Sequence, residues 1–212
     1  MIESTILEQL FIQAFPSVDK TGQQQAMQLY QLLAEGSSVS IDQIAKKINQ
    51  SPQETEQLLA TWTGVSINEQ QLIDGFWGVS TKETSHQFSI NQKTLYTWCA
   101  WDLLFMPVIY QQTISAKTQC PISGQMIELV ISPDRIDTVT PETTMITFIK
   151  PALDKIKEDV TGSFCQYVFF VDSEETGRQW QQQHSDGFLL SMEQGFDLGK
   201  KIIQQVFTSM YS

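Results

Sequence analysis

Basic residues are scarce in this chain of 212 residues. It carries 13 lysines and arginines against 24 aspartates and glutamates, which gives a net charge of −11 at pH 7. Residues 1–80 hold three lysines and nine acidic residues. Since the phosphates of a nucleic acid would be repelled by this charge, we expect no nucleic-acid partner.

Long hydrophobic runs are also missing. The most apolar stretches, around residues 103–109 and 168–171, fall well short of the roughly 18 residues that a transmembrane helix needs. Residues 1–15 contain Glu3 and Glu8 and have no basic start, unlike an export signal. We therefore expect a cytoplasmic protein with no membrane partner.

Cysteine is rare, and the common catalytic motifs are absent. Three cysteines without a CxxC pair argue against a disulfide scaffold and against a compact zinc site. The chain has no Gly-x-Ser-x-Gly elbow and no glycine-rich phosphate loop. His86 and His184 have no triad or helical spacing to other candidate residues, so neither hydrolase chemistry nor a nucleotide cofactor is supported.

The first 80 residues are typical of three short helices followed by a small hairpin. Apolar residues recur at helical spacing in 23–34 and 41–48, and Ser51, Pro52 and Glu54 form a capping-box start for a third helix. Glycines and aromatic residues in 65–79 indicate a hairpin. This order predicts a winged-helix-like N-terminal domain over residues 1–80.

Residues 81–212 are expected to form a second domain. Its predicted strands are 87–90, 113–119, 125–132, 145–149 and 163–171, and its predicted helices are 94–106, 177–183 and 192–210. Pro107 is expected to end the first of these helices. The fold class is therefore α+β, with a mixed, mostly antiparallel sheet and flanking helices.

Cys99 and Asp102 are three residues apart, so they share one face of the predicted helix 94–106. An aspartate in so apolar a segment must find hydrogen-bond donors or keep its proton to a higher pH. Two interpretations stay open here. Cys99 is a buried core thiol while Asp102 is satisfied by the backbone, Arg135 or Arg178, or else the pair carries chemistry.

The other two cysteines have equally plain alternatives as core residues. Cys165 lies in the predicted strand 163–171 on one face with Tyr167 and Phe169. Cys120 opens a Cys-Pro-x-Ser-Gly turn between two predicted strands.

Together these segments resemble the bacterial organomercurial lyases, also called alkylmercury lyases. The resemblance rests on Lys-Glu-Thr-Ser at 82–85, Leu-Tyr-Thr-Trp-Cys-Ala-Trp-Asp at 95–102, the isolated Cys120, and Ser-Phe-Cys at 163–165. It implies that Cys99, Asp102 and Cys165 are catalytic and bind mercury, and that Cys120 is structural. The chain departs from the pattern at Gln166, where some relatives have cysteine, and at Trp101, where a smaller residue is common.

The resemblance also implies a reaction. Cys99 binds the organomercurial and passes its proton to Asp102, Cys165 adds as a second thiolate, and Asp102 protonates the leaving carbon. No cofactor is expected, because mercury is substrate and product. Small thiols and mercuric reductase are the expected acceptors of Hg²⁺. A mercury-binding or trafficking protein without enzymatic activity is the alternative, and a metal-responsive regulator is disfavoured by the acidic charge.

Overall fold

The N-terminal part of the chain contains the three predicted helices and one more, over residues 2–14, that the sequence did not predict. The computed structural model describes residues 2–14, 19–150 and 152–208. The first four helices are α1 (Ile2–Ala14), α2 (Lys20–Leu33), α3 (Ile41–Ile48) and α4 (Pro52–Ala60). Capping boxes start two of them, with Ser40 and Gln43 at α3 and Ser51 and Glu54 at α4. Each such cap stabilises a helix by about 1 kcal/mol.

An eight-stranded antiparallel sheet runs through both halves of the sequence. Its order is β1-β2-β3-β5-β4-β6-β7-β8, with strands β1 (Val65–Ile67), β2 (Ile73–Phe76), β3 (Val79–Ser80), β4 (Gln87–Ile90), β5 (Lys93–Thr97), β6 (Ile114–Gln119), β7 (Met126–Ile131) and β8 (Ile136–Thr140). The expected 65–79 hairpin is thus continuous with the main sheet, since β3 pairs with β5. The winged-helix likeness and the division at residue 80 stay predictions.

A second, three-stranded sheet and the remaining helices complete the fold. The strands are β9 (Met145–Phe148), β10 (Phe170–Val171) and β11 (Phe188–Ser191), with β9 in the centre. The helices are α5 (Asp102–Tyr110), α6 (Leu153–Glu158), α7 (Val160–Ser163), α8 (Glu174–Gln183) and α9 (Met192–Val206). All pairings among the described strands are antiparallel, so the α+β class is confirmed and the expected mixed pairing is not found there.

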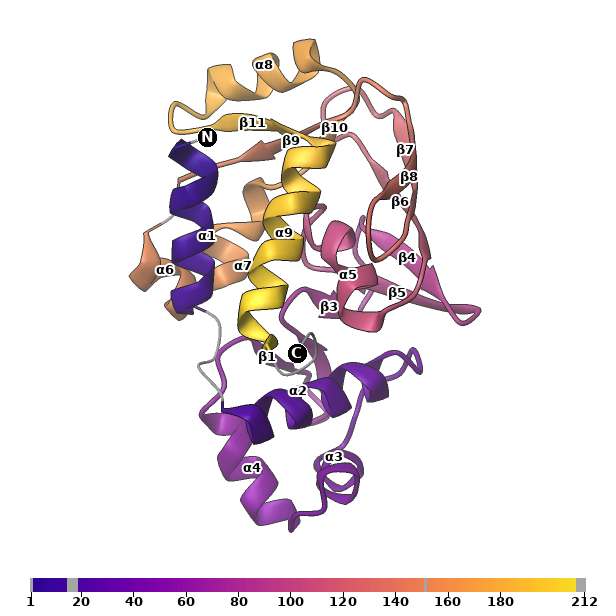
Figure 1. Cartoon of the computed structure of the whole chain (residues 1–212), viewed down its shortest axis with the longest axis vertical. Coiled ribbons are helices and arrows are strands. Elements are labelled where there is room, and N and C mark those ends of the chain that lie inside the picture. Colours follow the sequence, from indigo (N-terminus) through magenta and orange to yellow (C-terminus); the bar gives the residue numbers. More distant parts are fainter. Residues whose placement is uncertain (1, 15–18, 151, 209–212) are drawn as a thin grey trace.

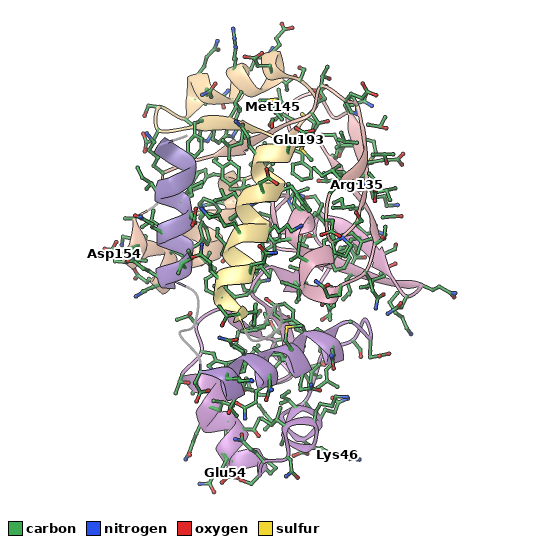
Figure 2. All side chains as sticks on the ribbon, viewed as in Figure 1. Lys46, Glu54, Arg135, Met145, Asp154 and Glu193 are labelled. Carbon is green, nitrogen blue, oxygen red and sulfur yellow. The ribbon has the colours of Figure 1, made fainter. Side chains whose placement is uncertain are left out.

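The helix α9 organises the core. It packs against α1, α5 and β11, and Figure 1 shows it beside α1, while α8 lies over the small sheet. The labelled charged side chains, such as Lys46, Glu54 and Asp154, lie at the outside of the molecule (Figure 2). The predicted closing helix 192–210 ends at Val206, and its last two residues lie outside the described part. No described helix has the length and apolar character needed to cross a membrane.

The predicted helix 94–106 is wrong in its first half. Residues 93–97 form β5, which pairs with both β3 and β4, and a short turn then leads into α5. A continuous apolar run is equally compatible with a buried strand and a buried helix, and here it contains one of each. Pro107 lies inside α5 instead of ending it, and the helix ends with Gln111 in a left-handed conformation.

The predicted strand 163–171 is also largely wrong. Residues 160–163 form α7, residues 165–167 form a 3₁₀ turn, and only Phe170 and Val171 are extended. Local hydrogen bonds replace sheet pairing, because Tyr167 donates its backbone N–H to the oxygen of Phe164 and Val168 donates to Cys165. The apolar side chains are buried as expected, but in an irregular segment.

Candidate active site

Cys99 lies in the turn between β5 and α5, and Asp102 is the first residue of α5. They therefore do not share a helical face as predicted. Instead the Asp102 carboxylate reaches back to accept the backbone N–H of Cys99 at 2.9 Å. The Thr97 hydroxyl donates to the Cys99 oxygen at 2.8 Å. These two bonds fix the turn so that the thiol and the carboxylate lie together.

Cys165 reaches the same place from a distant part of the chain. It lies in the 3₁₀ turn after α7 and is 5% exposed. The backbone N–H of Ala100 donates to the oxygen of Val168 at 3.3 Å, which ties the two segments to each other. The two thiol sulfurs and a carboxylate oxygen of Asp102 all lie within 4.8 Å of one another. The structure thus brings together all three residues that the sequence singles out.

Burial sets the protonation of this cluster. Loss of solvent raises the pKa of the Asp102 carboxyl to about 7, although N–H groups of Cys99 and Trp98 and the Cys99 thiol oppose this shift. Burial also raises the pKa of Cys99 well above its ordinary value. For Cys165 the largest influence, a hydrogen bond from Cys99, lowers the pKa, but burial and nearby carboxylates outweigh it. Near pH 7 the free site therefore holds two neutral thiols beside a carboxyl that binds its proton far more readily than an exposed aspartate does.

The expected basic partners of Asp102 lie elsewhere. Arg135 pairs with Asp137 at 2.7 Å and Arg178 pairs with Glu174 at 2.7 Å, both at exposed positions. Both ion pairs lie away from Asp102. The Asp102 carboxylate instead accepts hydrogen bonds from backbone N–H groups. A carboxyl near neutral pKa can take a proton and return it, which is what an acid and base catalyst requires.

Cys120 and His86 lie outside the cluster. Cys120 is 1% exposed, and its sulfur lies 3.9 Å from an Asp172 carboxylate oxygen. The His86 ring contacts the Thr118 hydroxyl at 2.8 Å, and burial lowers its pKa to about 4. Cys120 is a buried side chain with no chemical partner from the cluster, and His86 stays neutral at pH 7.

An apolar cavity of about 30 Å³ adjoins Asp102 and Cys165. Helices α1, α5 and α9 and the α7 segment supply most of its wall, which contains the aromatic residues Phe11, Trp77, Trp98, Trp101, Phe105 and Phe164. The contributions of α1 and α9 were not predicted from the sequence. The apolar residues of these two helices look the same in the sequence whether they pack in the core or line a cavity beside a reacting group.

Gly78 is a further residue that sequence reasoning missed. It adopts a φ of +92°, and a Cβ there would lie 2.9 Å from the Asp102 carboxyl carbon. Its oxygen accepts the Trp98 N–H at 3.0 Å. Only glycine allows the backbone to pass this close to Asp102 in this conformation. The sequence signal that could have identified Gly78 is its position directly after Trp77 in the turn of the predicted hairpin.

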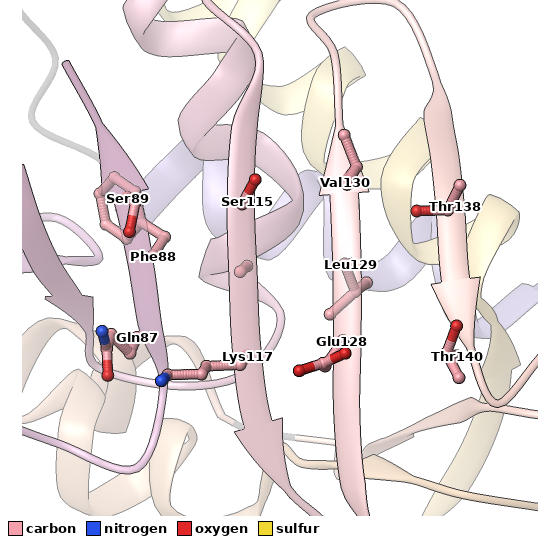
Figure 3. Close-up of a pocket in the computed structure, with 11 residues that line it drawn as sticks. Gln87, Phe88, Ser89, Ser115, Lys117, Glu128, Leu129, Val130, Thr138 and Thr140 are labelled. Atoms are coloured by element: carbon pink, nitrogen blue, oxygen red, sulfur yellow. The ribbon is translucent and has the colours of Figure 1, made fainter. Parts of the chain in front are cut away.

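A separate hollow on the sheet has no part in this cluster. It has a volume of about 390 Å³ and lies on the open face of β4, β6, β7 and β8. Figure 3 shows Gln87, Lys117 and Glu128 in one row across three of these strands. The hollow is lined mainly by ordinary polar side chains of a solvated sheet face, and it contains neither a thiol nor a histidine. Of these two spaces, only the small cavity adjoins Asp102 and Cys165.

Comparison with known proteins gives one consistent result. The family model described as MerB, alkylmercury lyase, matches residues 79–204. An alkylmercury lyase of Staphylococcus epidermidis is 32% identical over 174 residues, which cover 82% of this chain and 79% of that protein. One from Bacillus cereus is 33% identical over 172 residues, covering 81% of this chain and 77% of that protein.

A solved structure shares the fold. The crystal structure of the mercury-bound form of MerB2 aligns with a TM-score of 0.80 and 18% identity, over 95% of this chain and 99% of that one. The family model spans more than half of the sequence and includes all three residues of the cluster. By this match and by its curated relatives, the chain belongs to the alkylmercury lyase family.

Proposed function

We propose that this lyase cleaves the carbon–mercury bond of organomercurials by protonolysis at Cys99, Cys165 and Asp102. The observation that carries the proposal is the approach of two thiol sulfurs and one carboxylate oxygen to within 4.8 Å in a buried site. Thiolates suit a soft metal ion such as mercury. A carboxyl whose pKa is about 7 suits proton transfer near neutral pH.

The reaction balances with the residues of the cluster. Cys99 replaces the ligand X of the substrate R–Hg–X and gives its proton to the ionised Asp102. Cys165 then bonds to mercury and loses its proton, which leaves with X as HX. Asp102 delivers its proton to the carbon as the carbon–mercury bond breaks. The products are R–H and Hg²⁺ held by two thiolates.

Metal binding removes the barrier that burial imposes on the thiols. Their pKa values are raised in the free site, but a coordinated thiol is deprotonated outright. Substrate binding therefore creates the thiolates only when mercury is present. We include in the proposal that small thiols or mercuric reductase then accept the bound Hg²⁺, and that no further cofactor takes part.

A release assay tests the function directly. Purified, reduced protein is incubated with methylmercury and excess small thiol, and methane in the headspace is measured by gas chromatography. We expect methane and Hg²⁺ to form in equal amounts over many turnovers. Retention of mercury without methane would instead support the binding or trafficking alternative.

Gly78→Ala tests the placement of the acid. The new Cβ would lie 2.9 Å from the Asp102 carboxyl carbon, so the carboxyl must shift, and a shift of about 1 Å costs about 100-fold in rate. We expect kcat to fall at least tenfold while Hg²⁺ is still retained by the thiols. The measurement is the methane assay alongside mercury analysis of the desalted protein.

Gly36→Ala is the matched control for this prediction. Gly36 also has a positive φ, of +81°, but a Cβ there meets nothing closer than 3.7 Å. Its variant carries the backbone strain without touching the site, so its activity per folded molecule should match the wild type. Equal kcat values for the two glycine variants would contradict the positioning role of Gly78.

A further inference from the structure

We propose that Trp101 limits the organic group of the substrate to methyl and other very small alkyl groups. This inference rests on the proposed function, because it places the leaving carbon beside Asp102. Trp101 is 2% exposed, directly precedes the acid in the sequence, and lines the cavity that adjoins Asp102 and Cys165. Its indole therefore forms part of the wall of the space that the leaving group enters.

The position of the organic group follows from the cluster. Mercury held by the two thiols must present its carbon to Asp102 for protonation. The carboxyl is buried, and apolar atoms surround it on the cavity side. The apolar cavity lined by Asp102 and Cys165 is the space that an uncharged alkyl or aryl group can enter without losing hydrogen bonds. Every carbon of the group beyond the first must also fit there.

The cavity is small for such a role. Its 30 Å³ is about twice the space that one water needs, whereas a cavity of about 150 Å³ is known to hold benzene. A methyl group fits, but a phenyl ring requires the wall to move. Trp77, Trp98 and Val160 line both this cavity and a neighbouring hollow, so the two spaces share these side chains.

The indole of Trp101 is held too firmly to swing aside. Its Nε1 donates to the oxygen of Gly195 at 2.8 Å. Phe11, Phe105 and Phe148 meet the ring edge to face at centroid distances of 5.2 to 5.4 Å. The backbone of α9 approaches closely, since a Cβ at Gly199 would lie 3.4 Å from Nε1. Enlarging the cavity at Trp101 means breaking this packing.

The test compares a series of substrates on the wild type and on variants. Methyl-, ethyl-, propyl- and phenylmercury are supplied with the same thiol, and kcat/KM is measured from the released hydrocarbon. We expect the wild type to favour methyl over phenyl at least tenfold. Trp101→Leu should raise the phenyl-to-methyl ratio at least tenfold, and Trp101→Phe should raise it less.

Phe148→Leu is the matched control. Phe148 packs against Trp101 in the core but does not line the cavity, so its variant loses similar packing and should keep the wild-type ratio. If the wild type cleaves phenylmercury as well as methylmercury, or if Trp101→Leu leaves the ratio unchanged, the size limit is wrong and the lyase function stands. Failure of the wild type to release any hydrocarbon would overturn the proposed function and this inference with it.

Discussion

Asp102→Asn is expected to abolish methane release and, at alkaline pH, to stabilise the fold. The amide cannot deliver a proton to carbon, and loss of a general acid costs about 10² to 10⁴ in rate. Its oxygen can still accept the backbone N–H of Cys99, so the turn should persist. Both thiols remain, and the variant should therefore still bind Hg²⁺. Cleavage at the wild-type rate would exclude Asp102 as the acid.

The stability effect follows from the pKa of Asp102, which rises from 3.8 to about 7 on folding. Between these values the folded state holds a proton that the unfolded chain has lost, so stability falls as pH rises. The slope is about 1.4 kcal/mol per pH unit and the total about 4 kcal/mol. Asparagine has no charge to bury, although its NH₂ group costs about 1–3 kcal/mol if it is unpartnered.

Urea unfolding of the wild type and the variant at pH 5, 6, 7 and 8 measures this effect. The difference in unfolding free energy should move in favour of the variant as pH rises and level off above pH 7. Asp172→Asn is the control, because the Thr176 hydroxyl lowers the pKa of Asp172. Asp172 therefore titrates below the measured range, and the difference between its variant and the wild type should stay constant from pH 5 to 8. A flat difference for Asp102→Asn would contradict the buried, proton-holding carboxyl.

Local signals in the sequence were sufficient for the elements that depend on local chemistry. Ser51 starts its helix through a capping box, as the spacing to Glu54 indicates. The hairpin of β6 and β7 forms around the turn that Cys120 opens. In these places the structure depends on a side chain three residues away or on a tight turn. A short stretch of sequence is therefore sufficient to predict it.

The site itself depends on contacts between residues that are far apart in the sequence. Cys99 and Cys165 were identified by the family resemblance and not by spacing, and the local structures predicted for both were wrong. A helix was expected at Cys99 and a strand at Cys165, because apolar runs there do not distinguish between buried structures. The bond between Ala100 and Val168 that ties the two segments joins residues far apart in sequence.

The wall of the cavity was less predictable still. Phe11 comes from the first helix and Gly199 from the last, and they meet only because α1 and α9 pack together. Periodicity marks α9 as buried on one side, whereas α1 was not predicted as a helix at all. The periodicity does not say that the buried side of α9 faces a reacting group.

Cys99→Ser and Cys165→Ser are each expected to reduce methane release to the rate seen without enzyme. A serine hydroxyl has nearly the shape of the thiol, but it is a hard, weakly acidic ligand that does not bind mercury as a thiolate does. Each variant keeps one cysteine and Asp102, so only one thiolate can coordinate mercury when the carbon–mercury bond must break. Retention of Hg²⁺ against excess small thiol should be lost in both.

Cys120→Ser is the matched control, since it changes the third buried cysteine in the same way. Its sulfur contacts Asp172 instead of the cluster, so the variant should keep both methane release and one retained Hg²⁺ per chain, with lower stability. Methane, bound mercury and the urea midpoint are measured for all three variants. If folded Cys120→Ser lost cleavage while Cys165→Ser kept it in full, the second thiolate would be Cys120, and the assignment to Cys165 would be wrong. The opposite pattern places Hg²⁺ between Cys99, in the turn before α5, and Cys165, in the 3₁₀ turn after α7.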